Sequence, residues 1–414
     1  MSESENDLQD IFLGRQPILD RDNHIVAYEL LFRSGQVADA HVHDDLQASA
    51  QVIVQAFSER DIASVLGGKK GFINVSADLL MSDILELLPS DKVVIELLET
   101  IQIDERIIGR CRELKEMGFH MALDDFVGGA QFVPLFEIVE VVKFDLPLIK
   151  PADLKKNVTY LKHWPLQLLA EKVEDFEQAN HCKDLGFDLF QGYYFARPAV
   201  LSGKRTDASK LALMKLVGLV LNDAETTEIE QAFKHDPSLS FNLLRLVNSV
   251  AMGMSHKISS LKHAIIVLGR QQLQRWLQLL LFVNQSSDIH NPLLELAATR
   301  GRLMELLATV QAKRDKDYHD RAFMVGIISL LDSLLGMPLN EIIKQVNLSS
   351  DVEEALREHS GPLGSLLLLV KKMEQSDFDA AAVILDEMHL SRADLTQAQL
   401  EAMRWANDLK ELAE

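Results

Sequence analysis

Short apolar runs that end in a polar or charged residue recur through the first half of the chain. The run at residues 121–123 ends in two adjacent carboxylates, Asp124 and Asp125. Further runs deliver Glu29, Asn74, Glu96, Lys143 with Asp145, Glu171 with Glu174, and Gln191. An apolar run that ends in charge is typical of a buried parallel strand whose C-terminal end opens onto a site. Several such strand ends together form the active site of a β/α barrel, so the pattern predicts that architecture.

Segments with helical spacing of apolar residues separate these runs. They lie at Ala48–Leu66, Ala77–Leu88, Asp104–Met117, Ala152–Lys162 and Phe176–Leu185. Two earlier runs, Phe12–Ile18 and Ile25–Leu31, flank polar residues 20–23 and are expected to form a hairpin that leads into the barrel. Strand alternates with helix up to about Pro198, a length near the short end of the range for a closed (β/α)8 barrel.

The pattern changes after Pro198. Residues 201–209 are small and polar, and we expect them to form a linker after a barrel domain at residues 1–200. From residue 210 to residue 414 the apolar spacing is helical, and Asp236-Pro237 is typical of an N-cap with proline at the first helical position. The later helices are expected to include Leu261–Leu268, Gln271–Phe282, Leu293–Val310 and Asp320–Leu335. The predicted fold is therefore an N-terminal (β/α)8 TIM-like barrel followed by an all-helical C-terminal domain.

Composition narrows the class of partner. The 414 residues carry a net charge of −20, which argues against nonspecific binding to nucleic acid or to an anionic membrane. The two cysteines, Cys111 and Cys182, suit a reducing compartment better than a disulfide scaffold. The N-terminus is acidic rather than basic and apolar, and the apolar stretches are too short to span a bilayer. We therefore expect a soluble, cytoplasmic protein without nucleic-acid or membrane partners.

The polar residues at the expected strand ends include a set that offers only oxygen ligands. Its members are Glu29, Asn74, Glu96, Asp124 and Asp125. Oxygen ligands suit Mg²⁺ or Mn²⁺ rather than zinc, and a divalent cation relieves the repulsion between adjacent carboxylates. Such ions polarise a phosphoryl oxygen and activate water, so the set favours phosphoester hydrolysis. Lys143 and Glu171 are then candidates for orienting or deprotonating the attacking water.

These residues, in this order, resemble the EAL domain, a β/α-barrel family that hydrolyses cyclic di-GMP to the linear dinucleotide pGpG. The matching motifs are Glu29-Leu-Leu-Phe-Arg33, Asn74-Val-Ser76, Glu96-Leu-Leu-Glu99, Asp124-Asp-Phe126, Lys143-Phe-Asp145, Glu171-Lys-Val-Glu174 and the segment 191–198. The resemblance implies that the oxygen-ligand set holds Mg²⁺ or Mn²⁺ and that Lys143 and Glu171 handle the water. It also implies substrate contacts for Arg33, Asp145, Glu174 and Gln191, and support of the following loop by Glu99.

Three features depart from the family pattern. Residues 127–132 read Val-Gly-Gly-Ala-Gln-Phe, where the family usually has Gly-Thr-Gly-Tyr-Ser-Ser in a loop that couples substrate and metal binding. Lys172 stands where the family has a glycine, which places a bulky cation beside the expected base Glu171. Leu30 replaces the alanine of the namesake motif, which is a milder change. The expected metal ligands are therefore intact, while the loop that should couple them to substrate binding is altered.

The second half resembles the HDOD domain, a helical relative of the HD phosphohydrolases that lacks their metal site. The matching segments are 236–240, 244–249, 258–260 and 264–269. Where an active HD enzyme has His-Asp after a glycine and two apolar residues, this chain has Ser329-Leu330 after Gly326. The dipeptides His235-Asp236 and His319-Asp320 precede expected helices, so we do not expect a metal there.

Three functions are compatible with the sequence. The first is a metal-dependent cyclic di-GMP phosphodiesterase whose activity the HDOD domain modulates. The second is a signalling adaptor whose barrel binds cyclic di-GMP or a protein without turnover, while the HDOD domain recruits a protein partner. The third is a structural barrel with relic carboxylates. The EAL resemblance also implies a homodimer formed through the barrel domain.

Overall fold

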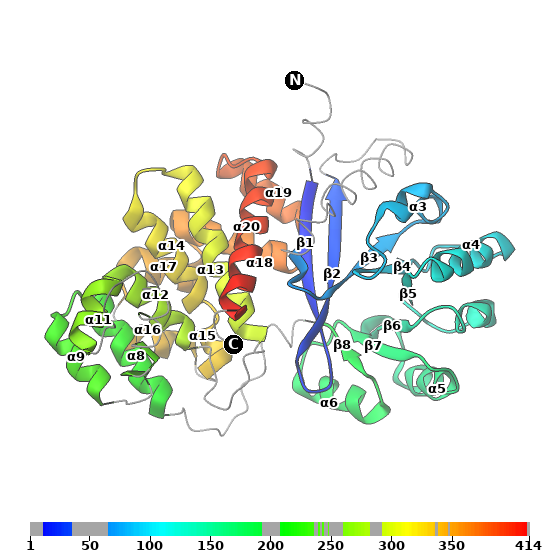
Figure 1. Cartoon of the computed structure of the whole chain (residues 1–414), viewed down its shortest axis with the longest axis horizontal. Helices are drawn as coiled ribbons and strands as arrows, with labels where there is room; N and C mark the ends of the chain where they lie inside the picture. Colours follow the sequence, from blue (N-terminus) through cyan, green and yellow to red (C-terminus); the bar gives the residue numbers. More distant parts are fainter. Residues whose placement is uncertain are drawn as a thin grey trace. The chain divides into compact units, whose positions relative to one another are not determined.

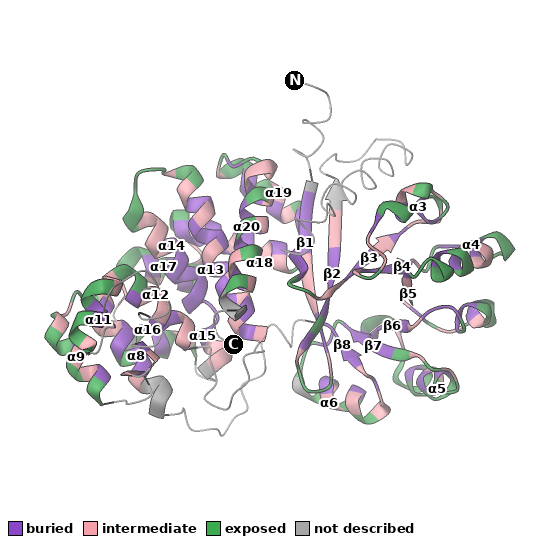
Figure 2. Ribbon diagram, viewed as in Figure 1, coloured by how far each residue is buried: buried purple, intermediate pink, exposed green. Residues whose placement is uncertain are grey.

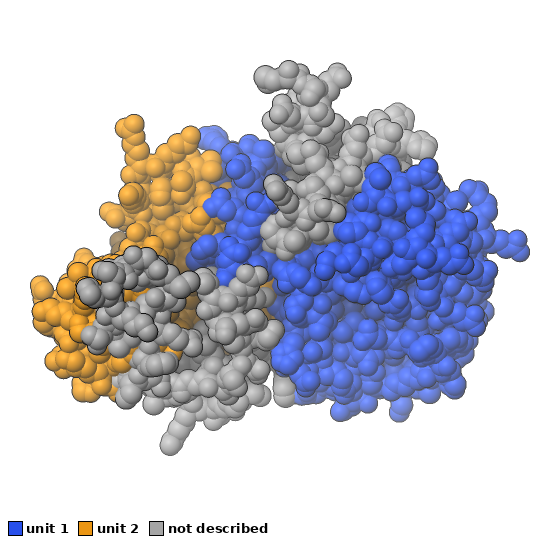
Figure 3. Space-filling model, viewed as in Figure 1, with its two compact units in different colours: residues 1–198, 369–414 blue, residues 199–368 orange. Residues whose placement is uncertain are grey.

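The structure, a computed structural model, describes residues 11–34, 65–192, 208–235, 239–240, 242–243, 247, 260–281, 292–335, 338–346 and 348–411. Two compact units make up the chain (Figure 3). Unit 1 combines Met1–Pro198 with Leu369–Glu414, and unit 2 is Ala199–Leu368. The expected helix at Ala48–Leu66, the expected linker and the expected helix that begins at Asp236-Pro237 lie largely outside the described residues.

Unit 1 contains a closed barrel of eight strands in chain order, which confirms the predicted architecture (Figure 1). The strands are β1 (Ile11–Leu19), β2 (Ile25–Ser34), β3 (Lys70–Val75), β4 (Val93–Leu97), β5 (His120–Leu123), β6 (Val141–Asp145), β7 (Gln167–Glu171) and β8 (Leu189–Phe190). Strand β1 pairs antiparallel with both β2 and β8, and the other neighbours are parallel. The expected hairpin therefore supplies two strands of the barrel itself.

Helices connect the barrel strands. They are α3 (Ala77–Leu80), η3 (Asp83–Leu87), α4 (Glu105–Glu116), η4 (Ala130–Leu135), η5 (Leu146–Leu148), α5 (Pro151–Leu161) and α6 (Phe176–Leu185). Side-chain caps fix where two of them begin, because Asp104 accepts from the Ile107 N–H at 2.9 Å and Asp175 accepts from the Gln178 N–H at 2.8 Å. The four helices expected between residues 77 and 185 are thus present, although the first is broken.

Serine hydroxyls mark the two places where an expected helix is interrupted. The Ser82 hydroxyl donates to the Leu79 carbonyl at 2.8 Å and ends α3, where a helix was expected to continue to Leu88. The Ser329 hydroxyl donates to the Gly326 carbonyl at 2.7 Å and ends α14 (Lys316–Ile328), where a helix was expected to continue to Leu335. Each hydroxyl occupies a backbone acceptor that the next helical N–H would use, which favours a break.

A ring of apolar side chains fills the inside of the barrel, with one residue from each strand. Its members are Ile18, Ala27, Phe72, Val94, Ala122, Val141, Leu169 and Leu189, all of which are buried. A much larger apolar cluster packs between the strands and their surrounding helices. The barrel is therefore closed by a packed floor rather than open as a pore, as expected of this architecture.

The last part of the chain packs on the barrel. Residues 369–414, which the sequence places in the second domain, belong to unit 1 and include α19 (Phe378–Glu387) and α20 (Arg392–Glu411). The Phe12 and Phe378 rings stack with centroids 5.6 Å apart, and the Gln399 side chain donates to the Leu13 carbonyl at 2.9 Å. Met403 on α20 is part of the outer apolar cluster of the barrel. These contacts join the end of the chain to β1.

The described part of unit 2 is helical, as predicted. Its helices are α8 (Ala208–Leu221), α9 (Thr226–Lys234), α11 (Leu261–Leu268), α12 (Arg270–Leu280), α13 (Pro292–Gln311), α14, α15 (Leu331–Leu335), α16 (Leu339–Val346), α17 (Ser350–Glu358) and the start of α18 (Gly361–Glu374). Figure 2 shows buried residues along α13 and α14. The two helices pack so closely at Gly326 that a Cβ on this residue would lie 2.7 Å from the Gly301 Cα. Within the described ranges, no helix combines the length and apolar character needed to cross a membrane.

Candidate functional site

A layer of polar side chains lies directly above the apolar floor of the barrel. Side chains alternate between the two faces of a strand, so the residue two positions from each floor residue points the same way. These residues are Gln16, Glu29, Asn74, Glu96, Asp124, Lys143, Glu171 and Gln191, one from each strand or the residue just after it. The strand ends predicted to carry the chemistry therefore meet in one place, above a floor that excludes water.

The layer holds an ion cluster centred on one ammonium group. The Nζ atom of Lys143 lies 2.6 Å from Glu96 Oε1, 2.9 Å from Glu171 Oε1, 3.1 Å from Asp124 Oδ1 and 3.6 Å from Glu29 Oε1. The Lys143 side chain is only 1% exposed. One internal cation therefore balances part of the charge of carboxylates that four different strands deliver.

Burial shifts the protonation of this cluster. It raises the pKa of Glu96 well above its ordinary value although Lys143 opposes the shift, and it raises the pKa of Glu171 to about 8, again against Lys143. Burial alone would lower the pKa of Lys143, but Glu96 and the other carboxylates raise it well above its ordinary value. The cluster therefore keeps a charged lysine and holds protons on carboxyl groups at neutral pH.

The chain turns sharply where the two adjacent aspartates follow β5. The Asp124 N–H still donates to the Leu97 carbonyl of β4 at 3.0 Å, and the Phe126 N–H donates to the Lys143 carbonyl of β6 at 2.9 Å. Asp125 lies between them with φ of 42°, in the left-handed region of backbone conformation. Burial, and then the neighbouring Asp124, raise the pKa of Asp125 to about 6.

Amide side chains surround Glu29. The Nε2 atom of Gln191 donates to Glu29 Oε2 at 2.6 Å and to Gln16 Oε1 at 2.7 Å, and Asn74 Nδ2 donates to Glu29 Oε1 at 3.2 Å. Gln16 is not among the residues predicted from the sequence. The signal that could have found it is its position opposite Glu29 on an antiparallel partner strand, two residues before the floor residue Ile18.

The other predicted site residues lie outside the polar layer. Asp145 is buried at the end of β6 and forms an ion pair with Lys172, which has φ of 55°. Glu174 is exposed beyond β7, and its backbone N–H donates to the Gln178 side chain at 2.8 Å. Arg33 lies on β2 with Phe12 as its partner in the strand register, and its side chain is outside the described residues. Lys172 therefore contacts Asp145 rather than the expected base Glu171.

The altered loop after Asp125 is held by packing. The carbonyl of Val127 accepts from Asn157 Nδ2 at 3.1 Å, and Gly128 and Gly129 have φ of 108° and 143°. Beyond them, the Phe132 ring packs edge-on against Phe126 with centroids 5.6 Å apart. Two glycines in conformations that other residues rarely adopt thus lead into the short helix η4.

The oxygen-ligand set fits a divalent cation. Among the described residues, the buried oxygens Asn74 Oδ1 and Glu96 Oε2 have no hydrogen-bond partner. Carboxylate oxygens of Glu99, Asp124 and Asp125 lie within 4.8 Å of one another, so Glu99 joins the predicted ligands at this point. Buried acceptors without donors and converging carboxylates are what a hard cation such as Mg²⁺ or Mn²⁺ requires.

Unit 2 has structural contacts where an HD enzyme would have its metal ligands. The Ser329 hydroxyl accepts from Arg300 Nη1 at 2.7 Å in a buried position between α13 and α14. The His319 ring contacts the Ala312 carbonyl at 2.8 Å, and Asp320 binds Arg275 at 2.8 Å. These polar side chains are used in holding helices together.

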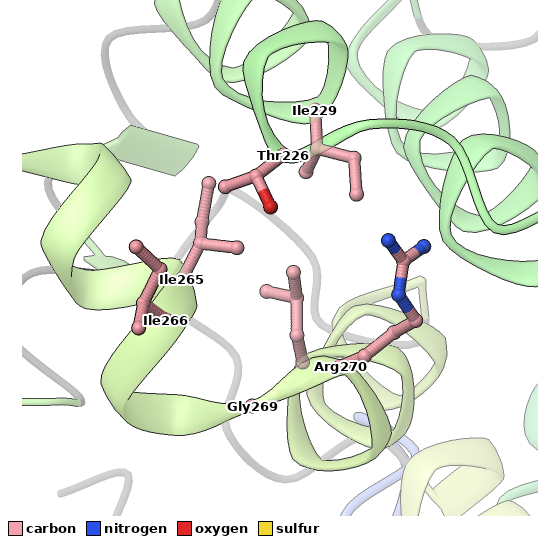
Figure 4. A pocket seen from close by; sticks show the side chains of 7 residues that line it. Thr226, Ile229, Ile265, Ile266, Gly269 and Arg270 are labelled. Atoms are coloured by element: carbon pink, nitrogen blue, oxygen red, sulfur yellow. The ribbon is translucent and has the colours of Figure 1, made fainter.

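A small pocket with a volume of about 140 Å³ lies among α9, α11 and α12 (Figure 4). Its walls include Thr226, Ile229, Ile265 and Arg270. The guanidinium of Arg270 donates to the Ala224 carbonyl at 2.7 Å and to the Val220 carbonyl at 3.4 Å, so it ties α12 to the end of α8. None of the residues that line this pocket belongs to the predicted site.

Both halves of the chain match known protein domains. The sequence profile of the EAL domain matches residues 7–198, and that of the HDOD domain matches residues 211–359. The chain is 30% identical to the protein YuxH of Bacillus subtilis over 411 residues, which cover 96% of this chain and 98% of YuxH. It is also 30% identical to the cyclic di-GMP phosphodiesterase CdgJ of Vibrio cholerae over 415 residues, which cover 99% of this chain and 95% of CdgJ.

Solved structures align with part of the chain. A standalone EAL protein from Vibrio cholerae O395 in its c-di-GMP-bound form covers 45% of this chain and 91% of its own, with 25% identity and a TM-score of 0.37. The two domain profiles and the two relatives that match over nearly their whole length agree with the barrel and the helical unit described above. The chain therefore belongs to the EAL family, in the form that joins an EAL domain to an HDOD domain.

Proposed function

We propose that this protein is a cyclic di-GMP phosphodiesterase that hydrolyses cyclic di-GMP to linear pGpG. The observation that carries the proposal is the polar layer of the barrel, where the carboxylates Glu29, Glu96, Asp124 and Glu171 surround Lys143. Such a cluster is suited to a phosphodiester that needs both cationic stabilisation and a base. The relative CdgJ, named a cyclic di-GMP phosphodiesterase, supports the same substrate.

The oxygen-ligand set would hold Mg²⁺ or Mn²⁺ between β2 and the turn after β5. We assign Glu29, Asn74, Glu96, Asp124 and Asp125 as its members, with Glu99 beside Asp125. When bound, the cation supplies Lewis-acid stabilisation of the phosphoryl oxygens. The metal would not be the only positive charge in the site, because the Lys143 ammonium already lies among these carboxylates.

Glu171 and Lys143 would handle the attacking water. Glu171 has a pKa raised to about 8 by burial, so its carboxylate accepts a proton readily near neutral pH once cations nearby favour its charged form. Lys143 Nζ lies 2.9 Å from Glu171 Oε1 and fixes the carboxylate that would take the proton. Attack of water on phosphorus breaks one P–O3′ bond, and the opened ring leaves with a terminal phosphate.

Gln191 of the polar layer and three residues outside the layer would contact the nucleotide. Gln191 and Asp145 lie at the ends of β8 and β6, and Arg33 and Glu174 lie beyond the ends of the layer on β2 and after β7. In this assignment the guanidinium of Arg33 pairs with a phosphate of the dinucleotide, which is the interaction that arginine favours. The Asp145–Lys172 ion pair would have to open for Asp145 to reach the nucleotide.

Binding without turnover is the second candidate function. Two observations favour it, namely the altered loop at residues 127–132 and the Lys172 ammonium seated on Asp145. In that case the barrel senses cyclic di-GMP and the HDOD domain recruits a protein partner.

One experiment on the full-length protein separates the two functions. Product formation from cyclic di-GMP is followed with Mg²⁺ or Mn²⁺, and binding is measured by calorimetry with Ca²⁺, for the wild type and for Glu29→Ala. We expect linear pGpG from the wild type and at most a trace from the variant. Binding in Ca²⁺ without product in Mg²⁺ and Mn²⁺ would support the adaptor, and absence of both would refute each proposal.

A further inference from the structure

A chain of hydrogen bonds leads from the C-terminal segment to Glu29. Gln16 Nε2 donates to Ser376 Oγ at 3.0 Å. Gln16 Oε1 accepts from Gln191 Nε2 at 2.7 Å, and the same nitrogen donates to Glu29 Oε2 at 2.6 Å. The four side chains come from the link after α18, from β1, from the end of β8 and from β2. Residues more than 300 positions apart in the sequence therefore meet in one network.

Glu29 determines which group donates and which accepts in each of these hydrogen bonds. The NH₂ group of Gln191 faces Glu29, since its Nε2 atom donates to Glu29 Oε2. Because that nitrogen has two hydrogens, the second one points to Gln16, which must present its carbonyl oxygen. The NH₂ group of Gln16 then faces Ser376, whose hydroxyl accepts. Each amide orientation is thus determined by the neighbour nearer to Glu29.

Ser376 is held in place by its surroundings. It has φ of 58° between α18 and α19, so the chain reverses sharply at this residue. Next to it, Asp377 pairs with Lys372 at 2.7 Å and caps α19 by accepting from the Ala380 N–H at 3.3 Å. Phe378 stacks on Phe12 of β1. The hydroxyl that ends the hydrogen-bond chain therefore sits on a fixed support rather than on a free loop.

We propose that Ser376 and Gln16 are positioning residues that orient Glu29 for metal binding through Gln191. The C-terminal segment 369–414 would then complete the site of the barrel, although it lies outside the residues matched by either domain profile. This inference rests on the proposed function, because it assigns Glu29 as a metal ligand. Partners that orient a metal ligand typically change metal affinity by about 10–100-fold when they are removed.

The test measures the Mn²⁺ dissociation constant of the full-length protein by calorimetry. The variants are Gln16→Met, which keeps the length of the side chain but removes both hydrogen bonds, Ser376→Ala, and the double variant. Ser376→Gly also removes the hydroxyl while suiting the positive φ, so it separates the lost hydrogen bond from backbone strain. Ser391→Ala is the matched control, because Ser391 bonds only locally with Asp394 before α20.

We expect Gln16→Met to weaken Mn²⁺ binding by about 10-fold or more and both Ser376 variants to weaken it by a smaller, similar factor. The double variant should bind like Gln16→Met alone, because residues in one network are not additive. Ser391→Ala should change thermal stability but not Mn²⁺ affinity. Unchanged Mn²⁺ affinity in Ser376→Ala and Ser376→Gly, or additive losses in the double variant, would overturn the proposed positioning role. A wild type that binds no Mn²⁺ would instead overturn the metal site itself and, with it, the positioning role of Ser376 and Gln16. Binding of Mn²⁺ without hydrolysis would overturn the proposed activity but would leave the test of the positioning role valid.

Discussion

Lys143 Nζ lies 2.6 Å from Glu96 Oε1, and both side chains are almost completely shielded from solvent, with 1% and 0% exposure. This contact joins β6 to β4 across the inside of the barrel. A buried carboxylate is costly unless a cation and hydrogen bonds compensate it. The ammonium of Lys143 therefore stabilises the carboxylate cluster, and three of its neighbours, Glu29, Glu96 and Asp124, also belong to the proposed metal-ligand set.

Removal of this ammonium should destabilise the metal-free fold. Lys143→Met leaves carboxylates from four strands without their internal cation, so we expect a loss of about 3–5 kcal/mol in the free energy of unfolding. Urea unfolding in the presence of a chelator measures this loss. Addition of Mg²⁺, or Glu96→Gln in the same background, should restore part of the stability. A Lys143→Met variant as stable as the wild type would show that the cluster is not charged in the way described.

The protonation of Glu171 predicts a pH-dependent stability. Its pKa is about 8 in the folded protein against an ordinary value of 4.5, so the folded state holds the proton more tightly than the unfolded chain does. This contribution to stability is complete below about pH 4.5 and is lost as the pH rises through about 8.

Glu171→Gln cannot titrate, so the comparison isolates this group. Between pH 5 and pH 9, roughly the range of the shift, the metal-free wild type should lose stability relative to Glu171→Gln. The free energy of unfolding in urea, measured at several pH values with a chelator, gives the difference. Parallel curves for the two proteins would contradict the raised pKa.

The backbone at Lys172 predicts different effects for two small substitutions. Lys172 has φ of 55° and pairs with the buried Asp145, so both glycine and alanine remove the ion pair while only glycine suits the backbone. We expect Lys172→Gly to be more stable than Lys172→Ala by about 1–2 kcal/mol. Urea unfolding of both variants measures this. Equal stabilities would mean that residue 172 does not hold the left-handed conformation in solution.

The two cysteines should not react in the native protein. Burial raises the pKa of both Cys111 and Cys182 to about 11, so each stays a protonated thiol at neutral pH. A thiol reagent at pH 8 should therefore label neither residue until the protein unfolds. In denaturant the chain should take up two equivalents, matching its two cysteines. A rapidly labelled thiol under native conditions would show that α4, which carries Cys111, or α6, which carries Cys182, opens.

The barrel and most of its polar layer could be predicted because the period of the strands is visible in the sequence. Apolar residues such as Val94 and Ala122 point inward, and the polar residues two positions later, Glu96 and Asp124, follow on the same face. Gln16 was missed because its strand runs antiparallel, so its inward polar residue precedes the floor residue instead of following it. The geometry that places Lys143 among the carboxylates depends on closure of the whole barrel.

The place of the C-terminal segment could not be predicted from periodicity. The helices α19 and α20 have the same helical pattern as those of unit 2, and nothing local shows that they pack on β1. Contacts such as the one between Gln16 and Ser376 are set by tertiary packing. The breaks at Ser82 and Ser329 were missed for a different reason, because serine also occurs within continuous helices and only its hydrogen bond shows the interruption.

The most direct test of the proposed function is analysis of the reaction product in water labelled with heavy oxygen. Full-length protein is incubated with cyclic di-GMP and Mg²⁺ or Mn²⁺, and the nucleotides are separated and weighed by mass spectrometry, with Glu171→Gln in parallel. The proposal predicts linear pGpG with one labelled oxygen in its terminal phosphate, and little or none from the variant. Intact cyclic di-GMP after prolonged incubation with protein that binds it would contradict the proposal and identify the barrel as a nucleotide sensor.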